Sequence, residues 1–172
     1  LDPTDMEGIF RSISLVAQAS GRREAGAGVV EGLRQRIEAV STTVARTKER
    51  PRVFFVVFHD PLWTAGQKTF IHDLIEAAGG TNIFADITDF QQVSLEQVLA
   101  RDPQVIIASV GHGSAQEALW QWVSQEPRLA GTAARRDGRV YSVAANLVNR
   151  PGPRIVLGLD TLARSIHPEL YR

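Results

Sequence analysis

The segment Val53–Asp86, VFFVVFHDPLWTAGQKTFIHDLIEAAGGTNIFAD, decides the fold of this chain. Its first six residues, Val53–Phe58, are all apolar and favour β structure, which is typical of a strand that is buried on both faces. A turn-rich loop follows at 59–66, and an apolar stripe then predicts a helix over 67–78 that Gly79-Gly80 ends. The loop is therefore expected at the carboxyl end of a buried strand, where open α/β sheets bind ligands.

The remainder of the chain continues this alternation of strands and helices. We predict further strands near 83–84 and at 105–110 and 139–143, and further helices at 94–101, 115–125 and 153–165. Ser94 and Gln97 have the spacing of a capping box at the start of one of these helices. Strands that alternate with helices predict an α/β fold in three layers, with a mostly parallel sheet between helices.

Two helices are predicted before the sheet, over residues 5–19 and 22–48. The second would be about 40 Å long at 1.5 Å per residue, which is about the diameter of a domain. An ordinary amphipathic surface helix would show the same pattern. We therefore divide the chain into a helical segment, 1–50, and an α/β lobe, 51–172.

Composition narrows the possible functions. The 172 residues include 19 basic and 19 acidic side chains, so no strong field favours binding to nucleic acid. The sequence has no cysteine, which excludes disulfides and thiolate chemistry, and it has no apolar run long enough for direct insertion into a membrane. We find no Gly-x-Ser-x-Gly or His-Glu-x-x-His motif, so we expect neither an enzyme nor a cofactor. The start, Leu1-Asp2-Pro3, indicates an internal fragment or a processed chain.

Four segments of the chain resemble, in order, the C-terminal lobe of class III substrate-binding proteins of ABC importers, which carry cobalamin, ferric siderophores or haem. They are PLWTAGQKTFIHDLIEAAGGTNIFAD (61–86), VSLEQVLARDPQVIIAS (93–109), RRDGRVYSV (135–143) and NRPGPRIVLGLDTLARSIHPE (149–169). Together they cover about two-thirds of the chain closely.

This resemblance implies an extracytoplasmic, periplasmic protein that binds a metal-chelate nutrient and delivers it to an ABC transporter permease. It also implies that an N-terminal lobe is absent from this chain, together with any lipid anchor at a missing N-terminus. The long helix at 22–48 would be the rigid connection that spans both lobes. Whether the chelate is a siderophore, haem or cobalamin stays open.

The resemblance assigns ligand contacts to four residues. Trp63 and Phe90 match positions that place aromatic side chains against the ligand, although aromatic residues in loops often serve only packing. Asn146 and Arg150 lie in a segment that matches a loop of the ligand cleft. A guanidinium suits carboxylate or amide groups on a ligand. Asn146 stands where some cobalamin binders have an acidic residue, which weakens the cobalamin assignment.

Glu96 matches a glutamate that docks on an arginine pocket of the permease. A carboxylate in the first turn of a helix also complements the helix dipole, so this position has a structural explanation as well. Docking needs only that the charge be exposed, and both roles are therefore compatible.

The histidines allow other interpretations. His112, in the turn Gly111-His112-Gly113-Ser114, follows a predicted buried strand and could receive an anion or the edge of a ligand. Our alternative is therefore a small flavodoxin-like enzyme or sensor domain that binds phosphate or a nucleotide at this turn. A metal site from His59 and His112 is a further possibility, whereas His72 and His167 are expected to be solvated.

Overall fold

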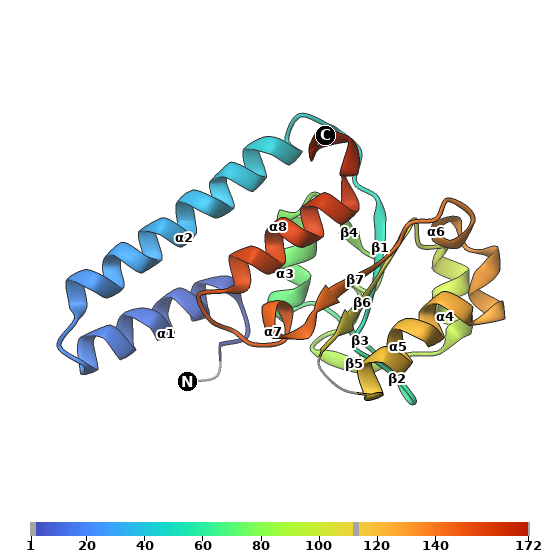
Figure 1. The fold of residues 1–172 in the computed structure, drawn as a ribbon, viewed down its shortest axis with the longest axis horizontal. Helices are drawn as coiled ribbons and strands as arrows, with labels where there is room; N and C mark the ends of the chain where they lie inside the picture. The colour runs from blue at the N-terminus through green and yellow to red at the C-terminus, as the bar shows by residue number, and fades with distance from the viewer. Residues whose placement is uncertain (1–2, 112–113, 172) are drawn as a thin grey trace.

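The computed structural model describes residues 3–111 and 114–171, and Figure 1 shows their arrangement. Four parallel strands form the main sheet in the order β4-β1-β6-β7, and they are β1 (Arg52–Val56), β4 (Thr81–Asn82), β6 (Val105–Val110) and β7 (Val140–Ala144). The register places Phe54 opposite Ile106, and Ile106 opposite Val140. The predicted parallel sheet is confirmed.

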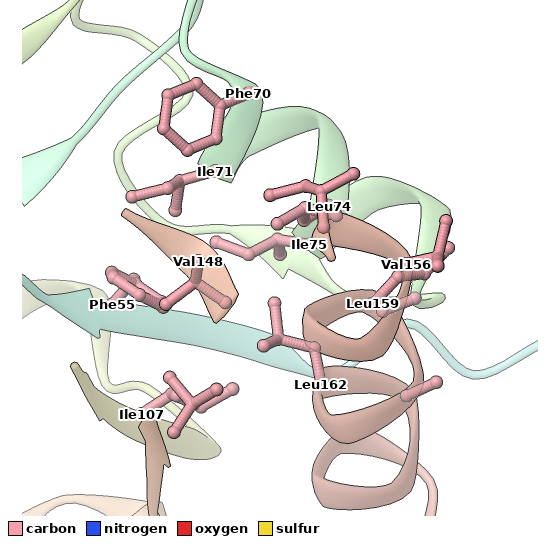
Figure 2. Packing of buried hydrophobic residues seen from close by; sticks show 14 of the residues in the cluster. Phe55, Phe70, Ile71, Leu74, Ile75, Ile107, Val148, Val156, Leu159 and Leu162 are labelled. Carbon is pink, nitrogen blue, oxygen red and sulfur yellow. The ribbon is translucent and has the colours of Figure 1, made fainter. Parts of the chain in front are cut away.

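Helices cover both faces of this sheet, which gives the three predicted layers. On one side lie α3 (Phe70–Ala77) and α8 (Ile155–Ile166), and on the other lie α4 (Leu95–Arg101) and α5 (Ser114–Gln125). Phe55 packs against the first pair and Phe54 against the second, so the apolar run of β1 is buried on both faces as its composition predicts. Figure 2 shows the first core, where sheet residues Phe55 and Ile107 face side chains of α3 and α8.

The N-terminal helices form a hairpin that packs on the outer side of α8 and α3 and extends past them in Figure 1. They are α1 (Met6–Ala19) and α2 (Arg23–Val44). Helix α2 has 22 residues, about 33 Å, and is shorter than the predicted 22–48. It ends because the N–H groups of Arg46 and Thr47 bond to carbonyls three residues back, which tightens the last turn. Among the described residues, no helix combines the length and the hydropathy that crossing a membrane requires.

A second, antiparallel sheet in the order β2-β3-β5 corrects two of our predictions. Its strands are β2 (Phe58–His59), β3 (Leu62–Ala65) and β5 (Phe90–Gln92). The strand predicted over 53–58 divides at Val57, whose N–H bonds to the carbonyl of Trp63. Most of the predicted loop 59–66 is therefore a strand hairpin, because the backbone groups beyond Val57 find their partners in β3 and not in the main sheet.

The remaining boundaries shift by a few residues. The short strand that we expected near 83–84 is β4, at 81–82. It ends there because the side-chain carbonyl of Asn82 accepts a hydrogen bond from the Phe84 N–H and the chain turns. Helix α3 begins only after Thr69, whose hydroxyl accepts from the N–H of His72 as an N-cap. The capping box before α4 is confirmed, with both of its hydrogen bonds present. Four short helices were not predicted: η1 (Pro127–Gly131), α6 (Ala133–Arg136), α7 (Ala145–Val148) and η2 (Pro168–Tyr171).

Candidate ligand-binding site

Three aromatic side chains share one face of the small sheet. Phe58 lies opposite Trp63, and Trp63 lies opposite Gln92. Phe90 precedes Gln92 by two residues and therefore points to the same face. Phe58 is 44% exposed, Phe90 is 39% exposed and Trp63 is half-buried, and none of them belongs to either core cluster. We call Phe58, Trp63 and Phe90 the aromatic platform.

The opposite face of the small sheet attaches the platform to the domain. Leu62 is buried in the second core. The Thr64 hydroxyl, fully buried, donates to the Phe55 carbonyl of the central strand at 2.7 Å. The ring of His59 packs in a tilted arrangement against Trp122 of α5, with 5.5 Å between the ring centroids. Because side chains alternate in direction along each strand, one face of the hairpin packs on the core and the aromatic face stays accessible to a ligand.

A polar pocket of about 620 Å³ lies at the carboxyl ends of β6 and β7. Its lining includes Ser142, Asn146, Asn149 and Arg150. Asn146 belongs to α7, and the Asn149 N–H bonds to the Ala145 carbonyl at 2.7 Å to end this short helix. Among the described residues that line the pocket, Arg150 is the one charged side chain, so the pocket offers hydroxyl and amide groups with a single guanidinium.

The predicted docking residue Glu96 lies in the first turn of α4 and is exposed. Its own backbone N–H, then the Ser94 hydroxyl, and then the charge of Arg128 lower the pKa of Glu96, so the carboxylate stays ionised at neutral pH. Within the described residues Glu96 forms no ion pair, and the nearby Arg128 pairs with Glu126 at 2.7 Å.

The histidine predictions have different outcomes. His112 lies outside the described residues, although the neighbouring Gly111 lines the polar pocket. The expectation that His167 is solvated is wrong: its ring is 1% exposed, with Gly79 O 3.1 Å from Nε2 and Glu169 Oε1 3.1 Å from Nδ1. The described residues contain no group of three His, Asp or Glu side chains arranged as metal ligands.

Sequence reasoning missed Phe58 as a member of the platform, because we assigned it to the buried central strand. The available signal was the dipeptide Asp60-Pro61, which favours a turn and lies between two short runs that can pair. Once β2 and β3 pair around that turn, the alternation of side chains separates Phe58 and Trp63 from Leu62.

Comparison with known proteins identifies the family to which this chain belongs. A family model described as periplasmic binding protein matches residues 1–147, which is most of the chain. The chain belongs to this family. The cobalamin-binding protein of Halobacterium salinarum is 31% identical over 168 residues, which are 95% of this chain and 45% of that protein.

Two solved structures of the periplasmic binding protein family show the same fold. The periplasmic heme-binding protein RhuT from Roseiflexus sp. RS-1 superposes with a TM-score of 0.85 at 27% identity, over 98% of this chain and 65% of that one. The vitamin B12-binding protein BtuF of Vibrio cholerae gives 0.80 at 26% identity, over 99% and 65%. These relatives favour a binding protein over the flavodoxin-like alternative. The chain spans about half the length of the curated relative it matches.

Proposed function

We propose that this chain is the C-terminal lobe, with its connecting helix, of an extracytoplasmic solute-binding protein that delivers a metal-chelate nutrient to an ABC importer. The observation that supports this most directly is the aromatic platform, which lies with the polar pocket at the carboxyl edge of the main sheet. Ligands of open α/β sheets bind at this edge. Family membership independently supports the same function.

The chemistry of the platform suits a large, flat ligand. Exposed aromatic rings gain free energy when an apolar or conjugated surface covers them, and stacking requires little directional bonding. Arg150 and the amides of Asn146 and Asn149 can bind the carboxylate or amide groups at the edge of such a ligand. A macrocycle or an aromatic siderophore combines these two features, and the relatives bind cobalamin, vitamin B12 and heme.

The domain organisation forms part of this proposal. Residues 1–50 are the helical segment and 51–172 the lobe. An apolar groove of about 500 Å³ runs between α1 and α2 and reaches the loop 151–153. Val16, which lines this groove, is more than half exposed. Exposed apolar surface of this kind is normally an interaction site. In this proposal, the N-terminal lobe of the complete protein packs on it.

Glu96 is the proposed contact to the permease. It is exposed, ionised and free of an ion pair within the described part of the chain, so an arginine pocket on a partner could bind it. Delivery to a permease places the protein outside the cytoplasm, in the periplasm or attached to the membrane by a lipid anchor in the complete protein.

The test is calorimetric titration of the complete protein with cyanocobalamin, hemin and a ferric catecholate siderophore, one probe for each class of chelate. We expect one of the three to bind tightly, and Trp63→Ala to weaken that binding while Trp120→Phe leaves it unchanged. Absence of binding by all three probes, in a folded protein, would refute the chelate function.

A further inference from the structure

Arg101, in the last turn of α4, binds the chain segment that follows β4. Its guanidinium donates to both carboxylate oxygens of Asp86, at 2.6 and 2.8 Å, and also to the carbonyl of Ile83. The same group lies 4.4 Å above the centroid of the Phe84 ring. Phe84 is fully buried and packs on Phe54 of the central strand, with 5.8 Å between centroids. Arg101 thereby fixes the start of the loop 83–89 to the main sheet.

The end of the same loop is held by backbone contacts with the segment after β3. The Gly66 N–H donates to the Asp89 carbonyl at 2.9 Å, and the Gln67 N–H donates to the Ile87 carbonyl at 2.7 Å. A Cβ atom on Gly66 would lie 2.3 Å from the Ile87 oxygen, so only glycine permits this approach. Phe90 follows at once as the first residue of β5, and the loop therefore determines where its ring lies.

We propose that Arg101 and Asp86 form a clasp that positions Phe90 for the ligand. The pair joins the end of α4 to the loop before β5, so it closes the stretch 86–101 into a ring of chain that contains Phe90. Arg101 is a positioning residue, since its contacts are with the loop and not with the platform. This inference rests on the proposed function, because Phe90 matters only where a ligand covers the platform.

A second ion pair of the chain offers a matched control. Arg164 binds Asp160 at 2.8 Å and lies 4.6 Å above the ring of Tyr171. It combines a carboxylate with an aromatic face, as Arg101 does, but it connects α8 to the C-terminal η2. Loss of this pair should affect local stability and leave the ligand site alone.

The first experiment is a double-mutant cycle on the complete protein, titrated with cyanocobalamin and with hemin. We expect Arg101→Met to weaken binding by about tenfold, because a displaced Phe90 ring covers less of the ligand surface. In the Phe90→Ala background, Arg101→Met should weaken binding no further. Arg101 acts on the ligand only through the Phe90 ring, and that ring is already absent. Arg164→Met should leave the affinity unchanged. Unchanged affinity in Arg101→Met, or additive losses in the double variant, would overturn the clasp.

The second experiment is independent of any ligand. Hydrogen–deuterium exchange of peptides covering 83–92 should be faster in Arg101→Met, with peptides covering 155–171 unchanged, and Arg164→Met should show the reverse. If Arg101→Met does not fold, Asp86→Asn serves in its place, because it removes the charge and keeps the shape. A wild type that binds none of the three chelates would count against the proposed function, whereas unchanged exchange at 83–92 would refute the clasp itself.

Discussion

Replacement of Phe58 by alanine tests the aromatic platform at the residue that our sequence analysis missed. An aromatic side chain buries about 200 Å² when fully covered, and 44% of Phe58 is exposed. A ligand that covers the ring therefore removes about 90 Å² from water, which at about 25 cal/mol per Å² is worth about 2 kcal/mol. We expect Phe58→Ala to weaken chelate binding by about 30-fold.

The assay is calorimetric titration of the complete protein with whichever of the three chelates it binds. Leu157→Ala is the matched control, because Leu157 is also 44% exposed but lies on α8, outside the platform. Phe58→Tyr should keep the affinity, since it keeps the flat ring, and Phe58→Leu should recover only the part that depends on apolar area. Equal affinities for Phe58→Ala and Leu157→Ala would show that Phe58 does not contact the ligand.

Three further predictions concern docking, acid stability and the loop. Glu96→Arg should abolish transport and leave the chelate affinity unchanged, because the reversed charge meets an arginine pocket on the permease. Uptake assays measure the first effect and calorimetric titrations the second. Normal uptake by this variant would refute the docking role. Hydrogen bonds from Arg101 lower the pKa of Asp86 from its ordinary 3.8, so the folded state binds this proton less readily than the unfolded state. The stability gap between wild type and Asp86→Asn should therefore be complete at pH 6 and narrow below about pH 4 in urea denaturation, and a gap that widens on acidification would contradict this sign. Gly66→Ala should destabilise the fold by about 1–3 kcal/mol, because the new Cβ would clash with the carbonyl oxygen of Ile87. Gly28→Ala is the control and should be neutral or stabilising, because its Cβ would lie in open space. Equal stabilities for the two variants would contradict the close approach at Gly66.

The main sheet could be predicted because its signals are local. The run Val53–Val56 is apolar at every position, and such a run is stable only where both faces are covered. The capping box at Ser94 likewise depends on two residues three apart, which a sequence displays directly. These features determine the order of strands and helices, and the three layers follow from that order.

The third strand of the small sheet, β5, could not be predicted because it pairs with a distant segment. Trp63 pairs with Gln92 across the whole of α3 and β4, and no local pattern marks that partner. His167 was misjudged for the same reason. It follows a helix in a polar sequence context, yet its ring is buried because the Gly79 carbonyl, 88 residues away, lies beside it. Burial of a polar ring depends on a hydrogen-bond partner that only the tertiary structure supplies.

The two halves of the proposed site differ in what they can distinguish. Stacking on the platform depends on exposed ring area, so siderophore, haem and cobalamin surfaces would all gain from it to a similar extent. The polar pocket offers fixed donors and acceptors, and a buried group left without a partner there costs more than a made hydrogen bond returns. It follows from the proposal that the platform supplies affinity and the pocket supplies selectivity. Exchange of Asn146 for aspartate should therefore alter the ranking of the three chelates, with anionic ligands losing most, while alanine at Phe58 should weaken all of them alike. A ranking that responds to Phe58 and not to Asn146 would reverse this assignment.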